Sequence, residues 1–244
     1  MWIPRRSDLL VALVLFAAPA QAAPLTVLAP ASAQAGLTPL AAQYTSDTKI
    51  MVTVGGGSRS NVLGALKTGP ADVVVLPTND MIELPTVAGM RPIGRIPVGV
   101  AVKAGAKVPD ISTPEKFRAV LLAAKGVAYA DPSAGTSAGK IIDIMLKDPE
   151  FKAVKRVPVQ GLAATALANG TATIALQLLP ELAADKGVSL AGPVPASYGA
   201  TVDFSAGIAA ATNDAVAAEA FISYLNEPKN AAVWQKSGLE PINR

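Results

Sequence analysis

The stretch Gly55-Gly56-Gly57-Ser58-Arg59-Ser60-Asn61 joins a β-rich run at residues 50–54 to a helix-like segment at residues 62–66. Three consecutive glycines let the backbone adopt positive φ, so a strand can turn sharply into a helix whose first N–H groups lack partners within the helix. Those N–H groups, two hydroxyls and the guanidinium of Arg59 suit an anion. The alternative is that a serine only caps the helix and Arg59 is a solvated charge.

Ser32 occupies a similar place in the chain. It follows a predicted strand at residues 25–28 and precedes a predicted helix at residues 36–44. Ligands of open α/β sheets sit beyond the carboxyl ends of the strands, so we expect Ser32 to face a ligand. Its hydroxyl is equally well explained as a helix cap.

A second turn of this kind is Gly135-Thr136-Ser137-Ala138-Gly139, between a predicted strand at residues 127–130 and a helix at residues 140–146. The spacing to Lys140 is one residue too short for a phosphate loop, and Ile141 replaces the hydroxyl that would hold magnesium. Ser137 and Lys140 also fit the Ser-x-x-Lys of penicillin-recognising enzymes, but the companion motifs are reversed in order or absent. We therefore interpret the turn as an anion-facing helix start.

Gln177 directly follows the strand predicted at residues 171–176. It would lie at the carboxyl end of that strand and face the cleft. The alternative is an exposed amide in a loop.

Strand-like and helix-like segments alternate along most of the chain, which predicts an α/β fold with an open sheet. Two longer β-rich stretches, at residues 90–102 and 201–210, break the pattern. We interpret them as two β crossings between two lobes, with a cleft between the lobes. The predicted organisation is a signal peptide at 1–22, lobe 1 at 23–97, lobe 2 at 98–200, and a return to lobe 1 at 201–244.

The composition excludes several kinds of chemistry. The chain has no cysteine and no histidine among its 244 residues, so it can form no Ser-His-Asp triad, no Cys nucleophile and no Cys/His zinc site. A net charge of +3 and 5% aromatic residues also argue against a nucleic-acid surface. We expect no catalytic residues, no metal and no cofactor.

The first 22 residues have the pattern of a secretory signal peptide. Arg5 and Arg6 form a basic start, residues 9–18 are apolar, and Ala20-Gln21-Ala22 is a small-residue cleavage signal. The apolar run is about half as long as the roughly 20 residues that span a bilayer. We therefore expect an exported, periplasmic protein.

These features together resemble the periplasmic solute-binding proteins of ABC importers, above all the molybdate-binding branch with its type 2 periplasmic binding fold. The resemblance covers most of the chain beyond residue 22. The matching motifs are Ala29-Pro30-Ala31-Ser32, the serine-rich turn, Gly69-Pro70-Ala71-Asp72, Asp131-Pro132 with Ser137-Ala138-Gly139, and the ending Phe221-Ile222-Ser223-Tyr224-Leu225 through Gly238-Leu239-Glu240-Pro241.

The resemblance implies two α/β lobes that close over an anion held by hydroxyls and backbone N–H groups. Ser32 and the turn at residues 58–60 match the ligands of the first lobe. Ser137-Ala138 matches a backbone donor of the second lobe, and residues 159–161 fall near another.

Two positions depart from the family pattern. Gln177 stands where the molybdate binders have a tyrosine, and Arg59 stands in the middle of the serine-rich turn. A planar guanidinium suits carboxylate or phosphate. The departure favours a carboxylate or a larger oxyanion over molybdate.

We therefore expect a monomeric binding protein that delivers a small anion, a molybdate-like oxyanion or a small carboxylate, to an ABC permease in the inner membrane. One alternative is a sensor or scavenger with the same fold. Another is a hydrolase that uses Ser137 and Lys140, although the chain supplies no third group to orient them.

Overall fold

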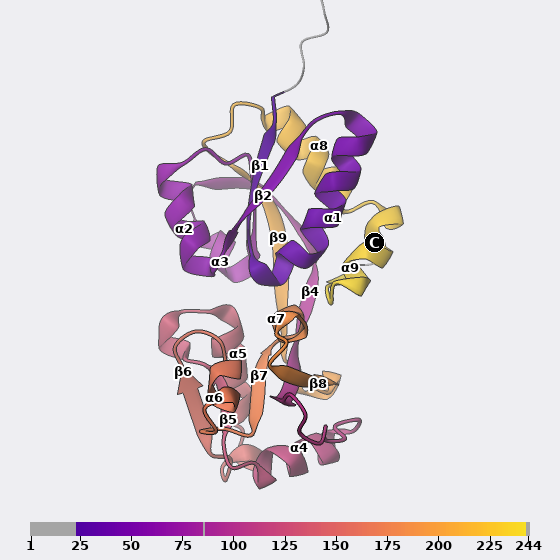
Figure 1. Cartoon of the computed structure of the whole chain (residues 1–244). Coiled ribbons are helices and arrows are strands. Elements are labelled where there is room, and N and C mark those ends of the chain that lie inside the picture. The colour runs from indigo at the N-terminus through magenta and orange to yellow at the C-terminus, as the bar shows by residue number, and fades with distance from the viewer. Residues whose placement is uncertain (1–22, 85, 243–244) are drawn as a thin grey trace, which may run out of the picture.

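The computed structural model describes residues 23–84 and 86–242. The predicted signal peptide lies outside the described residues. Figure 1 shows two lobes stacked end to end, with the long strands β4 and β9 at their junction. No helix in the described ranges combines the length and apolar character needed to cross a membrane.

The strands of the two lobes meet on one long strand, β4 (Val87–Lys103). The first lobe also contains β1 (Leu25–Pro30), β2 (Val52–Gly57), β3 (Val73–Pro77), β9 (Thr201–Ala209) and β10 (Glu240–Pro241). The second lobe contains β5 (Val127–Ala130), β6 (Arg156–Val159), β7 (Ile174–Leu178) and β8 (Val188–Pro193).

Each lobe is built around three parallel strands and a longer antiparallel one. In the first lobe β1 pairs in parallel with β2 and β3, and β3 pairs antiparallel with β9. In the second lobe β5 pairs in parallel with β6 and β7, and β7 pairs antiparallel with β4. β4 pairs with β9 up to Pro97 and with β7 from Val98 onward. The prediction of a two-lobed α/β fold with β crossings is confirmed.

Helices cover the faces of both sheets (Figure 1). Those of the first lobe are α1 (Ala31–Thr48), α2 (Arg59–Thr68), α3 (Thr78–Ile82), α8 (Ala215–Leu225) and α9 (Ala231–Lys236). Those of the second lobe are α4 (Pro114–Ala123), α5 (Ser137–Leu146), α6 (Ala164–Ala168) and α7 (Leu179–Ala184). α7 packs against α1, across the junction of the lobes.

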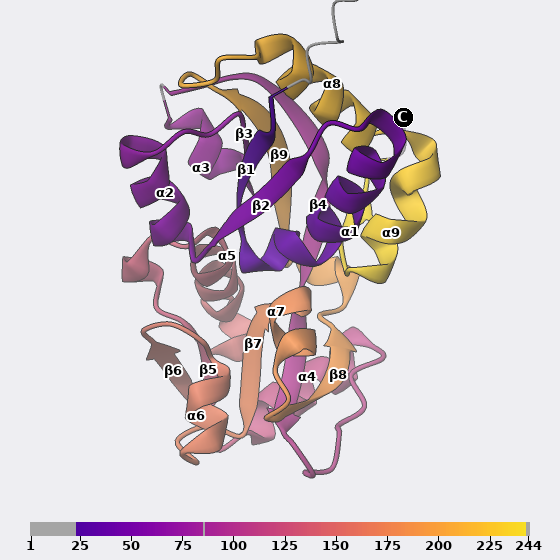
Figure 2. The same cartoon turned by 45° about the horizontal axis from the view of Figure 1, so that its top comes forward.

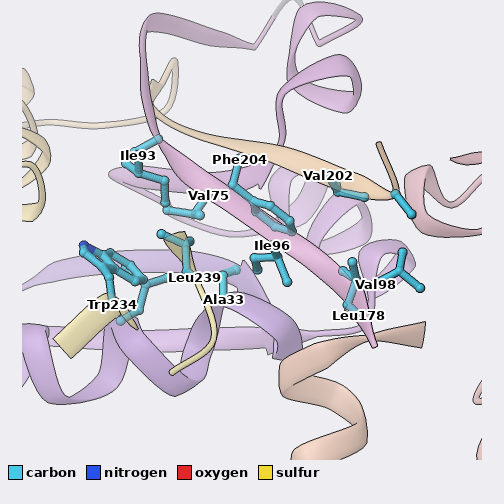
Figure 3. Packing of buried hydrophobic residues seen from close by; sticks show 14 of the residues in the cluster. Ala33, Val75, Ile93, Ile96, Val98, Leu178, Val202, Phe204, Trp234 and Leu239 are labelled. Carbon is cyan, nitrogen blue, oxygen red and sulfur yellow. The ribbon is translucent and has the colours of Figure 1, made fainter. Parts of the chain in front are cut away.

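The largest hydrophobic cluster runs through the junction instead of stopping at it. Figure 3 shows Ile96 and Val98 of β4 next to Phe204 of β9 and Leu178 of β7. All four side chains are buried. Because burying a large apolar side chain contributes about 1.5–3 kcal/mol, this cluster is a substantial link between the lobes.

The boundaries of three predicted elements are corrected by the structure. α1 begins at Ala31 and not at residue 36, so Ser32 belongs to its first turn. α5 begins at Ser137 and not at residue 140, because Thr136 caps it. β7 extends to Leu178, so Gln177 is a strand residue and not an exposed loop amide.

Candidate functional site

A cleft of about 690 Å³ lies between the lobes. The last residues of parallel strands from both lobes line it: Pro30, Gly57 and Pro77 from the first lobe, Ala130 and Leu178 from the second. The strands of each lobe thus end facing the other lobe. This is where open α/β sheets hold their ligands.

The glycine-rich turn carries β2 directly into α2 on the first-lobe side. Gly56 has φ +121°, and a Cβ placed there would lie 2.4 Å from the carbonyl oxygen of Ala29. Only glycine allows β2 to approach β1 this closely in that conformation. The close approach sets the position of Ser58 and Arg59 at the cleft.

Ser58 caps α2. Its Oγ accepts a hydrogen bond from the Asn61 N–H at 3.1 Å and lies 2.8 Å from Ser60 Oγ. Ser58 lines the cleft. Ser60 lies outside the lining, but its hydroxyl is hydrogen-bonded to that of Ser58. One hydroxyl of this pair donates to the other. When Ser60 is the donor, the hydrogen of Ser58 is free for a ligand in the cleft.

Arg59 is held in place by a carboxylate that the sequence analysis did not select. Its Nε donates to Asp80 Oδ2 at 2.8 Å, and the Asp80 side chain is 4% exposed against 28% for Arg59. A Cβ built on Gly135 would lie 3.9 Å from Arg59 Nη1, so the guanidinium reaches towards the second-lobe turn. The ion pair fixes the plane of the fork and leaves the terminal nitrogens at the cleft.

Ser32 is buried in the first turn of α1 and lines the cleft. The residue before this helix is Pro30, and no side chain caps the helix start. The first N–H groups of α1 therefore have no side-chain acceptor at the cleft. The partly positive end of an 18-residue helix favours negative charge there.

On the second-lobe side, a short turn is braced by Asp131. Its carboxylate accepts a hydrogen bond from the Ser133 N–H at 2.8 Å and another from Gln160 Nε2 at 3.2 Å. The hydrogen bond from Ser133 holds the pKa of Asp131 below its usual value. Thr136 then caps α5 by accepting from the Gly139 N–H at 3.2 Å.

The predicted residues of this turn line the cleft together. Thr136, Ser137 and Ala138 all belong to its wall, and Ser137 and Ala138 are the first two residues of α5. N–H groups in the first turn of a helix have no partner within it, so they are available to an anion. Lys140 is exposed and lies outside the lining.

Gln177 is buried and uses both ends of its amide. The Ala163 N–H donates to Gln177 Oε1 at 2.9 Å, and Gln177 Nε2 donates to Glu181 Oε2 at 2.7 Å. The backbone donor fixes which end of the amide is the oxygen. Gln177 thus lines the cleft mainly as the support of Glu181.

Glu181 is the second carboxyl group that the sequence analysis did not select. It lies in the first turn of α7, directly after Pro180, and lines the cleft on the second-lobe side. Burial raises its pKa, while hydrogen bonds from Gln177 and Ser32 act in the opposite direction. Of the described residues, none forms an ion pair with it.

Asp80 and Glu181 each follow a strand end, the same signal that selected Ser32 and Gln177. Asp80 comes three residues after β3, and Glu181 comes three residues after β7. The apolar part of the wall, which includes Phe204, Leu176 and Ile142, gives no such signal because it reads as ordinary core. The described residues contain no cluster of acidic residues suited to a metal ion.

The model of the family described as bacterial extracellular solute-binding proteins matches residues 25–240. The chain belongs to this family. The match spans both lobes and every residue of the cleft wall described above. The resemblance stated from the sequence is confirmed at the level of the family.

Named relatives of this solute-binding protein differ in their described activity. An aconitate isomerase of Pseudomonas sp is 30% identical over 180 residues, which cover 71% of this chain and 68% of that protein. The substrate-binding domain ascribed to a molybdenum ABC transporter of Clostridium difficile is 14% identical with a TM-score of 0.70, covering 91% of this chain and 100% of that one. The periplasmic molybdate-binding protein of Azotobacter vinelandii is 21% identical with a TM-score of 0.62, covering 90% and 100%. At these identities the two structures establish a shared fold.

Proposed function

We propose that this chain is a periplasmic solute-binding protein that holds a small carboxylate in its interlobe cleft and delivers it to an ABC permease. The ligand residues are Ser32, Ser58 and Arg59 in the first lobe and Thr136, Ser137 and Ala138 in the second, where Gln177 acts as the support of Glu181. Ser60 acts through Ser58. Lobe 1 would comprise residues 23–97 and 201–244, lobe 2 residues 98–200, and ligand would favour the form in which they are closed.

The observation that carries the proposal is the orientation of Arg59. Asp80 occupies its Nε, so the terminal nitrogens present a fork to the cleft, near the start of α5. A planar fork can hold two oxygens of a carboxylate or of a phosphate-like oxyanion at once. The guanidinium therefore favours a carboxylate or a larger oxyanion over molybdate, and the size of the cleft and the named relative favour the carboxylate of these two.

Two further observations support a carboxylate over molybdate. A cleft of 690 Å³ lies within the range of about 300–1,000 Å³ that is typical of sites for small organic molecules. The relative at 30% identity takes its name from aconitate, a carboxylate. Both favour a ligand larger than a bare oxyanion.

The test is calorimetry of purified protein, stripped of any ligand by partial unfolding and refolding. It is titrated with trans-aconitate, citrate, succinate, phosphate, sulfate and molybdate. We expect at least one carboxylate to bind more tightly than every inorganic anion. Tightest binding of molybdate or sulfate would contradict the carboxylate, and no binding of any anion would overturn the proposal.

A second candidate function is isomerisation of an unsaturated carboxylate, which the named relative and the half-buried carboxyl of Glu181, with its raised pKa, favour. Incubation with trans-aconitate followed by proton NMR separates the two. Binding without new signals supports a binding protein, whereas catalytic appearance of the cis isomer supports an enzyme. The Ser137–Lys140 hydrolase is disfavoured, because Lys140 is exposed and lies outside the cleft wall.

Permease delivery is separable from the sensor or scavenger alternative. Deleting the gene should abolish uptake of radiolabelled ligand by intact cells, with restoration by the wild-type gene. Unchanged uptake in the deletion strain would favour the sensor or scavenger.

A further inference from the structure

An acidic side chain in the wall of an anion-binding cleft needs an explanation. Three carboxyl groups lie in the cleft wall: Asp80 on the first lobe, and Glu181 and Asp185 on the second. Asp80 is paired with Arg59, so its charge is balanced. Glu181 has no such partner among the described residues, so its charge would face the ligand directly.

The position of Glu181 is fixed by its neighbours. Gln177 cannot turn away, because its Oε1 is held by the Ala163 N–H at 2.9 Å while its Nε2 donates to Glu181 Oε2 at 2.7 Å. On the other side Ser32, from the first lobe, is close enough to influence the carboxyl. Glu181 therefore sits where the two lobes meet, and its hydrogen bond from Gln177 holds the carboxyl in the cleft wall.

The charged groups around Glu181 do not neutralise it. Asp185 and Lys186, at the end of its own helix, line the same cleft and carry opposite charges. Of the elements packed against α7, the nearest turns of α1 contribute Ser32 and no charged residue, and the only charge on that helix is Asp47 in its last turn. β8 carries no charged residue, and Lys236 of α9 is exposed. β4 carries Lys103 at its far end and two arginines that pair with other carboxylates, Arg91 with Glu219 and Arg95 with Asp203.

An ionised Glu181 would repel an anion bound to Arg59 and the helix starts. Like charges a few ångströms apart in a partly buried cleft destabilise each other strongly. One proton held between Glu181 and the anion removes the repulsion and adds an O–H donor to the site. Burial already raises the pKa of Glu181, which lowers the cost of holding that proton.

We propose that the cleft binds its anion together with one proton, and that Glu181 is the residue that holds this proton against the ligand. The inference rests on the proposed function and adds the protonation state of the site to it. Glu181 then selects ligands by hydrogen bonding: it donates to a carboxylate oxygen, and it rejects an anion whenever the proton is absent. Binding is thus proton-coupled.

The test is calorimetry with trans-aconitate at a pH above the last pKa of the free acid, repeated in two buffers with different ionisation enthalpies. The difference in heat gives the protons taken up per ligand bound. We expect wild type to take up close to one proton and Glu181→Gln to take up almost none. Affinity of wild type should fall about tenfold per pH unit at high pH, while that of Glu181→Gln stays flat.

The matched control is Glu115→Gln. Glu115 also follows a proline in the first turn of a helix, but it is exposed and lies outside the cleft. This variant should keep the proton uptake of wild type. If wild type and Glu181→Gln take up equal numbers of protons, the inference is overturned and the proposed function stands. If wild type does not bind the ligand at all, the proposed function itself is wrong.

A second measurement needs no variant. Infrared difference spectra of wild type, with and without trans-aconitate labelled with ¹³C at its carboxyl carbons, separate protein from ligand bands. We expect an unlabelled protonated-carboxyl C=O band in the complex at neutral pH. If this band is absent, Glu181 carries no proton in the complex and the inference is overturned. This result does not depend on whether Glu181→Gln folds.

Discussion

The two sides of the cleft handle charge in different ways. The first-lobe side presents Arg59, a permanent cation that a buried carboxylate holds in one orientation. The second-lobe side presents a capped helix start and Glu181, a carboxyl group that a buried amide holds in place. The first lobe attracts an anion through a fixed positive charge, whereas the second lobe carries a group that can gain or lose a proton. Substitutions on the two sides should therefore change different properties, and by different amounts.

The largest difference is expected at the two turns that lead into α2 and α5. Gly56→Ala should destabilise the protein by about 3–4 kcal/mol, because it combines overpacking against Ala29 with a strained positive φ. Gly139→Ala should cost about 1–3 kcal/mol, since it brings crowding against the Ala130 carbonyl oxygen, at 2.6 Å, and Thr136 Oγ1, at 2.8 Å, but no positive φ. Urea unfolding followed by circular dichroism measures both.

Gly55→Ala is the control for this pair. No atom lies within 4 Å of a Cβ placed there, and its φ is not positive. The free energy of unfolding should change by less than about 1 kcal/mol. A loss at Gly55 as large as that at Gly56 would show that the turn is not selected for its backbone geometry.

Removal of the cation should have the next largest effect. Arg59→Ala should weaken carboxylate binding about 10- to 100-fold, the equivalent of roughly 1.5–3 kcal/mol for a charge-assisted hydrogen bond, and should weaken molybdate less. Titration calorimetry measures both losses. Arg95→Ala removes an arginine whose ion pair with Asp203 is exposed and outside the cleft, so it should bind as wild type does. Equal losses of carboxylate and molybdate in Arg59→Ala would remove the argument for a carboxylate.

Loss of a helix cap should have a smaller effect. Thr136→Ala should lower the free energy of unfolding by about 1 kcal/mol, because the Gly139 N–H loses its acceptor. Thr136→Ser keeps the oxygen and should retain most of that stability. If Thr136→Ala and Thr136→Ser unfold at the same urea concentration, the hydroxyl is not the cap that the 3.2 Å distance indicates.

The smallest effect should be the pH dependence of the ligand-free protein. Unfolded Glu181 loses its proton near 4.5, whereas the folded protein holds it to higher pH. Above 4.5 the native state binds more protons than the unfolded state, so this group lowers stability as pH rises through the folded-state pKa. Glu181→Gln should therefore gain stability relative to wild type over that window, measured as thermal midpoints across a pH series. A constant difference between the two proteins would contradict the raised pKa.

The fold could be predicted because its signals are local. Alternation of strand-like and helix-like segments indicated the sheets, and the β-rich stretch at residues 90–102 became β4. Element ends were less accurate, because Pro30 ends a strand and also precedes the first residue of a helix. A proline fits either place, so its local pattern did not separate loop from helix.

Only some of the residues in the cleft wall could be predicted from the sequence, and the reason is physical. Hydroxyls and glycines at a strand end suggest an anion by themselves, and these selected Ser32 and the turn around Arg59. The roles of Asp80 and Glu181 depend on which side chain lies opposite each of them: Arg59 for one and Gln177 for the other. Those pairings are made by tertiary contacts, so no local sequence pattern predicts them.

The buried cluster is continuous across β4 and β9, and this continuity affects how the protein unfolds. A single apolar body that reaches into both halves cannot be lost from one of them without exposing the other. Thermal unfolding should therefore give one cooperative calorimetric peak instead of two, even though the chain forms two lobes.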